Sequence, residues 1–337
     1  MKSAKLTSIK NIEIVEESVP QIKSAKDVLV EVKAVGICGT DLHIFAHGRA
    51  DVSFPRVMGH ELSGLVKEVG SDVTSVKVGD RVVLDPVFAC DNCRICNSGH
   101  QNVCGDVKCY GVQMDGGYQD YIVVEDKHLY AFDPKISFEQ AALAEPFSIG
   151  ANIMMKTATT ADDTVVVIGS GTIGLCIVAV AKGIGAKVLV ADVVDTKLEK
   201  AKTIGADVVV NSTNENLAEA VEKFSPGGAT VVVDAVGVSA LTQQSIDLAC
   251  PTARVAFIGF DSKPVEIAPI VVTKKELTIV GSRMNCHQFP KVMKWLDEGK
   301  INADLMISRV YPVTEIQKAF EETLANGKDI VKTLIAF

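Results

Sequence analysis

The segment TVVVIGSGTIGLCIVAVAKGIGAKVLVAD, residues 164–192, indicates the fold class of the second half of this 337-residue chain. It begins with a β-branched apolar run, which is typical of a strand buried on both faces of a parallel sheet. A glycine-rich turn follows, then a helical pattern over residues 173–182, then the strand KVLVAD. The alternation continues through a helix over Lys197–Thr203 and the apolar runs DVVV, TVVVDAVG, RVAFIGF and LTIVGS. This pattern predicts an α/β domain with a doubly wound parallel sheet.

The turn in this segment has the spacing of a phosphate-binding loop. It reads Gly169-Ser-Gly171-Thr172-Ile173-Gly174, directly after a strand and at the start of a helix. The first glycine permits the tight turn, the second lets backbone approach a pyrophosphate, and the third lets helix and strand pack closely. The helix N-terminus supplies N–H groups and a positive dipole end. We therefore expect a dinucleotide site at these six residues.

Asp192 ends the next strand, eighteen residues after Gly174. An acid there can accept hydrogen bonds from a ribose 2′-hydroxyl and repel a 2′-phosphate, which favours NAD over NADP. Two alternatives stay open at this point. Asp192 could serve only as a turn former at the strand end, and a nearby basic residue such as Lys197 could tolerate NADP.

The first part of the chain has a different sequence pattern. From Val28 to about Tyr130 it holds short β-rich runs, VLVEVKAV, LSGLVKEV, RVVLD and YQDYIVV, separated by turn residues. This predicts a compact, mainly β domain, so that the chain has two domains, as its length also suggests. Amphipathic helices are expected over Phe289–Gly299 and Thr314–Leu324, and these need not belong to the α/β domain.

Four of the nine cysteines fall within fifteen residues of each other. The spacing Cys90-x2-Cys93-x2-Cys96-x7-Cys104 suits a tetrahedral zinc site with no position open for substrate, which makes the site structural. An iron–sulfur cluster is the alternative, but the usual proline is missing. The remaining cysteines outside the candidate sites are expected to be apolar fillers: Cys109, Cys176, Cys250 and Cys286.

A second possible metal site lies upstream. The strings Gly36-Ile-Cys38-Gly-Thr40-Asp-Leu-His43 and Gly59-His60-Glu61 offer one soft and one borderline ligand in Cys38 and His60. A third ligand from elsewhere would leave one coordination position open, as catalytic zinc requires. Taken singly, each of these residues would more often be structural.

These motifs, in this order, resemble the zinc-containing medium-chain dehydrogenases. The resemblance rests on Cys38-Gly-Thr40-Asp-x-His43, Gly59-His60-Glu61-x2-Gly64-x5-Gly70-x2-Val73, the four-cysteine run and the glycine motif, and it covers almost the whole chain. It implies a GroES-like β-barrel catalytic domain over residues 1–148 and 284–337. It also implies a Rossmann domain over residues 149–283 inserted between these parts.

The resemblance also implies the roles of individual residues. Cys38 and His60 match zinc ligands, and Glu61 or Glu145 supplies the carboxylate ligand or holds a metal-bound water. The alternative for one of these two acids is a place in the second coordination sphere. Ala144-Glu145-Pro146-Phe147-Ser148 is similar to the Glu-Pro segment of the sorbitol and threonine dehydrogenase branch. Thr40 and His43 match the residues that carry the alcohol proton out of the cleft.

The expected reaction is hydride transfer between NAD and a secondary alcohol of a small polyhydroxylated substrate, with two zinc ions per chain. Arg56 and Arg283 lie in segments similar to those of sugar-acid dehydrogenases, and either arginine could pair with a carboxylate. The favoured substrate is a sugar acid oxidised at C5, such as L-gulonate or L-galactonate. The alternatives are a sorbitol-like polyol and L-threonine, and a structural role for either arginine is at least as plausible.

Charge and hydropathy argue against other classes of protein. A net charge of −8 gives no basic surface for nucleic acid or anionic membranes. The uncharged run 164–181 is interrupted by glycines and is better explained by a strand, turn and helix than by a membrane span. Without a signal peptide pattern we expect a cytoplasmic protein, and we expect a homodimer or homotetramer. A zinc-free reductase similar to quinone reductases and a zinc-ribbon interaction module remain as rivals.

Overall fold

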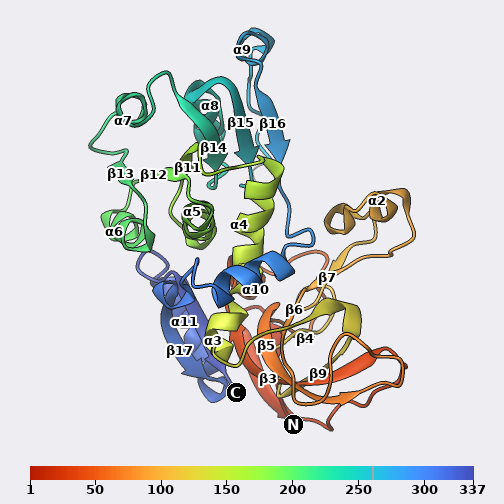
Figure 1. Ribbon diagram of the computed structural model, residues 1–337. Coiled ribbons are helices and arrows are strands. Elements are labelled where there is room, and N and C mark those ends of the chain that lie inside the picture. The colour runs from red at the N-terminus through yellow and green to blue at the C-terminus, as the bar shows by residue number, and fades with distance from the viewer. Residues whose placement is uncertain (260–261) are drawn as a thin grey trace. The chain divides into compact units, whose positions relative to one another are not determined.

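The computed structural model describes residues 1–259 and 262–337 and contains two compact units (Figure 1). The β unit comprises Met1–Glu145, Asn285–Asp297 and Met306–Phe337, so it is built from both ends of the chain. The α/β unit comprises Pro146–Met284 and Glu298–Leu305. The assignment of catalysis to one unit and of cofactor binding to the other stays a prediction.

The α/β unit contains one six-stranded sheet of parallel strands in the order β13-β12-β11-β14-β15-β16. In chain order this is 3-2-1-4-5-6, the strand order of dinucleotide-binding Rossmann folds. The strands are β11 (Thr164–Ile168), β12 (Lys187–Asp192), β13 (Val208–Asn211), β14 (Ala229–Asp234), β15 (Ala249–Phe257) and β16 (Thr278–Gly281). The predicted fold class is confirmed.

Helix α4 (Ala144–Lys156) enters the α/β unit from the β unit, which holds its first two residues. The other helices that flank the strands are α5 (Thr172–Ile184), α6 (Asp195–Ile204), α7 (Leu217–Phe224), α8 (Ser239–Asp247) and α9 (Pro269–Lys275). A 3₁₀ turn, η3, covers Ala303–Leu305. The helices expected over 173–182 and 197–203 are α5 and α6, each slightly longer than expected. The expected strand RVAFIGF ends at Phe260, and this last residue lies outside the described residues.

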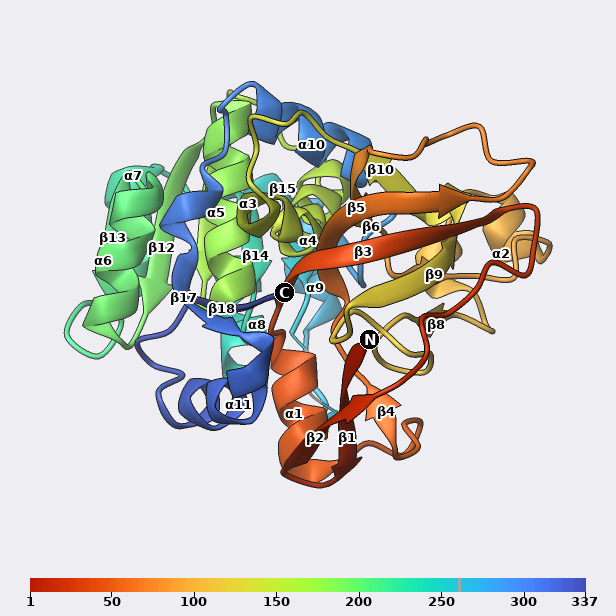
Figure 2. The same cartoon turned by 90° about the horizontal axis from the view of Figure 1, so that it is seen from below.

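The main sheet of the β unit has the order β10-β6-β5-β3-β18-β17, with β9 also paired to β3. Figure 2 shows β3, β5 and β9 side by side. The C-terminal strand β18 pairs with β3 antiparallel and with β17 parallel. The strands are β3 (Asp27–Gly36), β5 (Glu61–Val69), β6 (Arg81–Leu84), β9 (Tyr121–Glu125), β10 (Leu129–Ala131), β17 (Ile307–Pro312) and β18 (Lys332–Ala336).

The β unit also holds two small sheets and several short helices. One sheet joins β1 (Lys2–Ser8), β2 (Asn11–Glu16) and β4 (Arg56–Val57), and the other joins β7 (Val87–Phe88) and β8 (Lys108–Cys109). The helices are α1 (Gly39–His47), α2 (Arg94–Asn97), α3 (Phe138–Ala142), α10 (Phe289–Asp297) and α11 (Ile316–Ala325), with 3₁₀ turns η1 (Gln101–Val103), η2 (Asp126–His128) and η4 (Val313–Glu315).

The core of the β unit explains how distant segments come together. Phe45 of α1, Phe320 of α11 and Tyr118 are fully buried, and the Phe320 ring packs at a tilt against Phe45 and edge-on against Tyr118. Burying an aromatic ring of this size contributes about 1.5–3 kcal/mol, so this cluster fixes α1 beside the C-terminal helix α11. The start of α1 is where Cys38 and Asp41 lie.

The uncharged run at residues 164–181 is divided between β11 and the first part of α5. In the part of the chain that the structure describes, no helix has the length and apolar character that crossing a membrane requires.

Candidate functional site

The ends of β3 and β5 bring the upstream metal-ligand candidates together. Gly36, the last residue of β3, pairs with Glu61, the first of β5. Cys38 follows as the N-cap of α1, and His60 precedes Glu61. One ligand atom from each of Cys38, His60 and Glu61 lies within 4.8 Å of the other two. The structure thus joins three of the predicted ligands in one cluster.

The electrostatics of this cluster favour a cation. Burial alone would lower the pKa of His60, but the negative charges of Asp41 and Cys38 outweigh it and raise the pKa well above its ordinary value. The surroundings that favour a positive charge on this buried imidazole would also stabilise a metal dication. The donor set of thiolate, imidazole and carboxylate is one that zinc accepts.

Glu61 is held by a buried lysine that sequence reasoning missed. Lys332, the first residue of β18, donates to Glu61 Oε1 at 2.7 Å and to the Ile37 carbonyl at 3.0 Å. Both side chains of this pair are almost completely buried. Glu61 Oε2 has no hydrogen-bond partner among the described residues. A Cβ atom on Gly36 would lie 1.9 Å from that oxygen, so glycine is required there.

Asp41 is a second residue that the sequence analysis did not single out. It is fully buried, its Oδ2 accepts from the Cys38 N–H at 2.9 Å, and its Oδ1 lies 3.6 Å from His60 Nδ1. Burial raises the pKa of Asp41, and the charge of His60 opposes that shift. A carboxylate behind a ligand histidine fixes the ring and its tautomer.

Glu145 lies in the first turn of α4 and is also buried. Burial raises the pKa of Glu145 to about 7, while the charge of His60 opposes the shift and that of Glu61 adds to it. Its carboxylate is not in the group of mutually close ligand atoms that Cys38, His60 and Glu61 form. The candidate ligand Glu145 is therefore electrostatically coupled to the cluster without being part of it in this conformation.

Thr40 and His43 lie on the first two turns of α1, three residues apart and therefore on one face of that helix. Thr40 is half-buried and His43 is exposed, with its ring 5.3 Å from that of His47. The proton route through these two residues stays a prediction.

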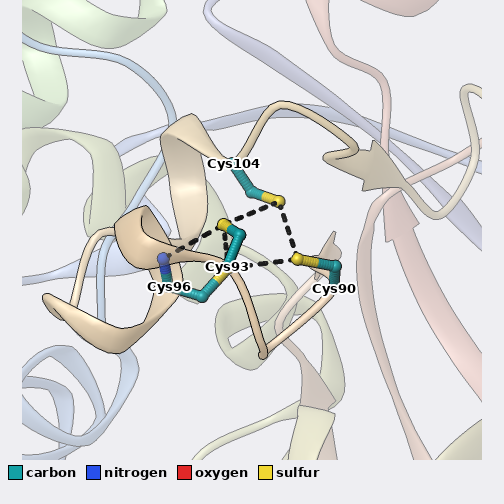
Figure 3. Close-up of side chains that lie close together, drawn as sticks. All are labelled: Cys90, Cys93, Cys96 and Cys104. Carbon is teal, nitrogen blue, oxygen red and sulfur yellow. Dashed lines mark hydrogen bonds between the residues drawn. The ribbon is translucent and has the colours of Figure 1, made fainter.

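The four clustered cysteines form a second group with metal-ligand geometry (Figure 3). Their sulfur–sulfur distances are 3.5 Å for Cys93–Cys96 and Cys90–Cys104, 3.8 Å for Cys90–Cys96 and 3.9 Å for Cys93–Cys104. A zinc ion with Zn–S bonds of about 2.3 Å sets sulfurs about 3.8 Å apart. The four thiols are thus spaced for a tetrahedral site.

Backbone N–H groups near the four cysteines also favour a metal site. Cys93 is the N-cap of α2, and its sulfur accepts from the Cys96 N–H. Backbone N–H groups of Asn92 and Cys93 lower the pKa of the Cys90 thiol to about 7. The apolar cluster around these sulfurs consists of little more than Ala89, Val107 and the cysteines themselves. The segment therefore depends on its thiols, rather than on a hydrophobic core, for cohesion.

The glycine-rich loop has the expected conformation between β11 and α5. Gly169 has φ +97°, and a Cβ on Gly174 would lie 1.9 Å from the Gly169 carbonyl oxygen. Gly171 is the N-cap of α5, and a Cβ there would meet open space. Thr172 and Ile173 begin the helix. The loop is therefore tight on the strand side and open at the helix N-terminus, where a phosphate would bind.

Asp192 contacts this loop directly. Its Oδ2 accepts from the Ser170 N–H and hydroxyl, both at 2.7 Å, and its Oδ1 accepts from the Val193 and Val194 N–H groups. Burial raises the pKa of Asp192, but these hydrogen bonds outweigh it and hold the pKa below its ordinary value. Asp192 is thus an anion at the edge of the loop, and it also ties the loop to the end of β12.

The two candidate substrate arginines differ in their surroundings. Arg56, on β4, donates to Asp115 at 2.8 Å and to Ser53 at 3.4 Å. Arg283 follows β16 and is exposed. Arg56 is therefore already committed to an ion pair within the β unit, whereas Arg283 is an exposed residue of the α/β unit.

Comparison with known proteins shows the family to which this chain belongs. The family model of the alcohol dehydrogenase GroES-like domain matches residues 24–134, and that of the zinc-binding dehydrogenases matches residues 172–298. The starvation-sensing protein RspB of Escherichia coli K12 is 38% identical over 100% of this chain and 99% of its own length. The L-galactonate-5-dehydrogenase of the same organism is 33% identical over 94% of this chain and 93% of its own.

Among solved structures, the rspB alcohol dehydrogenase from E. coli CFT073, complexed with NADH, superposes with a TM-score of 0.94 at 37% identity. That comparison covers 100% of this chain and 99% of the other. Polyol and sugar dehydrogenases recur among the curated relatives. The chain is therefore an enzyme of the alcohol dehydrogenase class and belongs to the zinc-binding dehydrogenases that carry a GroES-like domain.

Proposed function

We propose that this protein oxidises a secondary alcohol at C5 of a sugar acid, such as L-galactonate or L-gulonate, with NAD as the hydride acceptor. The observation that carries the chemistry is the buried cluster of Cys38, His60 and Glu61 in a zinc-binding dehydrogenase chain. The substrate is supported by the similarity to an L-galactonate-5-dehydrogenase over nearly the whole length of both proteins.

The residues at the end of β3 and the start of β5 would hold the catalytic zinc. When bound, zinc lowers the pKa of a coordinated alcohol and so makes hydride loss feasible near neutral pH. Cys38 and His60 supply two ligands, and Glu61 or Glu145 supplies the third. Asp41 Oδ1 faces His60 Nδ1 at 3.6 Å, and Lys332 holds Glu61 by its Oε1, while Oε2 has no hydrogen-bond partner among the residues that the structure describes. Thr40 and then His43 take the alcohol proton toward solvent.

The glycine-rich loop would hold the pyrophosphate of NAD at residues Gly169, Gly171, Thr172, Ile173 and Gly174. The open N-terminal end of α5 supports a pyrophosphate at this place. The negative charge of Asp192 at the end of β12 suits the ribose 2′-hydroxyl of NAD. The complex of a 37% identical structure with NADH supports it as well.

Asp192→Ala is expected to raise KM for NAD and to shift the NAD/NADP preference by about tenfold to a hundredfold toward NADP. The reason is that a charged hydrogen bond to the ribose, worth about 1.5–3 kcal/mol, and the repulsion of a 2′-phosphate both disappear. Steady-state kinetics with both cofactors measure the change.

Asp192 also accepts four hydrogen bonds from its surroundings, so loosening of the loop must be separated from loss of cofactor contact. Asp192→Asn keeps the side-chain shape and removes the charge, and Asp195→Asn removes a charge three residues further on. We expect the first to shift selectivity and the second to leave it unchanged. An unaltered NAD/NADP ratio in both Asp192 variants would assign the preference to another residue.

The carboxylate of the substrate is assigned to Arg283, with Arg56 as the second candidate. Arg283→Leu is expected to cost the sugar acid about 1.5–3 kcal/mol of transition-state stabilisation, the range for a charged hydrogen bond, and to leave a neutral polyol of equal length nearly unaffected. Values of kcat/KM for the two substrates measure the difference. Arg56→Leu is the parallel test for the second candidate, whose side chain pairs with Asp115.

NADH production with aldonates, polyols and L-threonine as substrates tests the proposal on the wild-type enzyme. A preference for sorbitol-like polyols over every aldonate, or equal losses on acid and polyol in both arginine variants, would favour the polyol dehydrogenase that is the alternative. An arginine that only braces backbone would slow both substrates alike.

A further inference from the structure

Tyr118 lies directly behind Asp41 and has no role in the function proposed above. Its side chain is 1% exposed, and its hydroxyl lies 3.2 Å from Asp41 Oδ2 and 3.1 Å from the Gly36 carbonyl oxygen. A phenol has one proton, and a carboxylate is the stronger acceptor of the two. The hydroxyl therefore donates mainly to Asp41.

The position of Tyr118 is fixed to the segment that carries His60. Gly116 N–H donates to the Val57 carbonyl, Gly117 N–H to that of Gly59, and Tyr118 N–H to that of Met58, at 2.8, 2.7 and 3.0 Å. These bonds set residues 116–118 alongside residues 57–59.

The ring of Tyr118 is fixed as well. A Cβ on Gly59 would come within 3.1 Å of it, so the glycine before His60 makes room for the tyrosine. On another side the ring packs edge-on against Phe320, with ring centroids 5.7 Å apart. The hydroxyl is thus presented to Asp41 from a rigid support.

The two oxygens of Asp41 face different partners. Oδ2 receives the Cys38 N–H and the Tyr118 hydroxyl, while Oδ1 faces His60 Nδ1. Neither Oδ1 nor Nδ1 has a hydrogen-bond partner within the described ranges. Without the tyrosine hydroxyl, one backbone N–H alone would fix the carboxylate, and its rotation would carry Oδ1 away from the imidazole.

We propose that Tyr118 is a positioning residue for the catalytic metal centre. Tyr118 orients Asp41 so that Oδ1 accepts a hydrogen bond from Nδ1 of His60. Nε2 of the same ring is then the atom that would bind the metal. This inference rests on the metal site in the proposed function, because it assigns the metal to Cys38 and His60. In this proposal Tyr118 acts through Asp41, to which its hydroxyl donates.

Zinc transfer from the purified holoenzyme to the chelator dipicolinate tests this role without reference to turnover. Outer partners of ligand histidines contribute about tenfold to a hundredfold to metal affinity. For Tyr118→Phe we expect one of the two zinc ions to be held about tenfold more weakly. The zinc at Cys90, Cys93, Cys96 and Cys104 should be released as in the wild type, and it serves as the internal reference.

Two further variants isolate the path through Asp41. Tyr110→Phe removes a phenol hydroxyl from another buried tyrosine of the β unit, packed on Phe88 and His128, and should leave both zinc ions unaffected. Asp41→Asn should weaken the same zinc, and adding Tyr118→Phe to it should have no further effect, because the two residues act in series. In the cobalt-substituted enzyme, the Cys38 thiolate charge-transfer band should shift in both single variants.

The outcomes distinguish a failure of the role of Tyr118 from a failure of the metal site in the proposed function. Equal weakening of both zinc ions in Tyr118→Phe, unchanged zinc release, or additive effects with Asp41→Asn would each overturn the role of Tyr118 and leave the catalytic site in place. A wild-type enzyme with a single zinc, held by the four cysteines, would instead overturn the metal site in the proposed function, and this inference with it.

Discussion

His60→Ala is expected to lower kcat/KM by about a thousandfold or more while NADH still binds. The reason is that electrostatic stabilisation at the substrate oxygen is worth several kcal/mol, and each 1.36 kcal/mol is a factor of ten in rate. The glycine-rich loop between β11 and α5 contains no residue of the cluster, so cofactor binding should persist. Cys38→Ser should have the same effect, and steady-state kinetics with NADH fluorescence titration measure both quantities.

A matched control uses a cysteine outside the cluster. Cys250→Ser changes a half-buried thiol of β15 and should retain activity and two zinc ions per chain. Metal analysis of His60→Ala should give one zinc instead of two. Near-normal turnover in either ligand variant would contradict the zinc mechanism, and a wild type without zinc would place the chain with reductases that use none.

Cys96→Ser is expected to destabilise the β unit before it affects the chemistry. Structural zinc contributes about 10–16 kcal/mol in small peptides, so loss of one ligand should remove several kcal/mol of stability. At about 2–4 °C per kcal/mol, Tm should fall by roughly 10 °C or more, and zinc content should fall by one. The apolar cluster there has almost no members besides the cysteines, which leaves little to replace the metal.

Limited proteolysis gives the location of this effect. Residues 90–107 should become the first cleavage site in Cys96→Ser and in Cys93→Ser, while fragments of the α/β unit stay protected. Scanning calorimetry that gave the wild-type Tm for both variants would mean that the four cysteines bind no metal or do not need it.

The sequence was most informative where function depends on residues close together in the chain. The glycine spacing required a strand before it and a helix after it, and β11 and α5 lie there. The cysteine spacing sufficed for the four-sulfur group because the ligands lie within fifteen residues. To predict that Cys38 and His60 lie together, one must know that strands β3 and β5 are neighbours. The resemblance to a family implied this contact, and the pairing of Gly36 with Glu61 explains it.

The supporting residues were beyond prediction because their contacts cross large separations. Lys332 and Glu61 are 271 residues apart, and Tyr118 and Asp41 are 77 apart. No periodicity connects such pairs, and a lysine in a strand ordinarily suggests an exposed face. Their burial follows from β18 entering the sheet next to β3, a pairing of the two ends of the chain that local patterns do not encode.

The pairing of β3 with β18 also dictates the order in which the protein can be completed during synthesis. The strands of the α/β sheet are continuous in sequence, whereas the Ala34–Gly36 end of β3 is paired on both sides only after β18 has been made, because β9 covers Asp27–Glu31 alone. At about 5–20 residues per second, roughly ten to forty seconds separate the synthesis of Glu145 from that of Lys332. Throughout that interval the Ala34–Gly36 end of β3 has an edge open to other chains, and Glu61 lacks its cation. The part of β3 that leads into the metal site is therefore the part that stays unpaired longest.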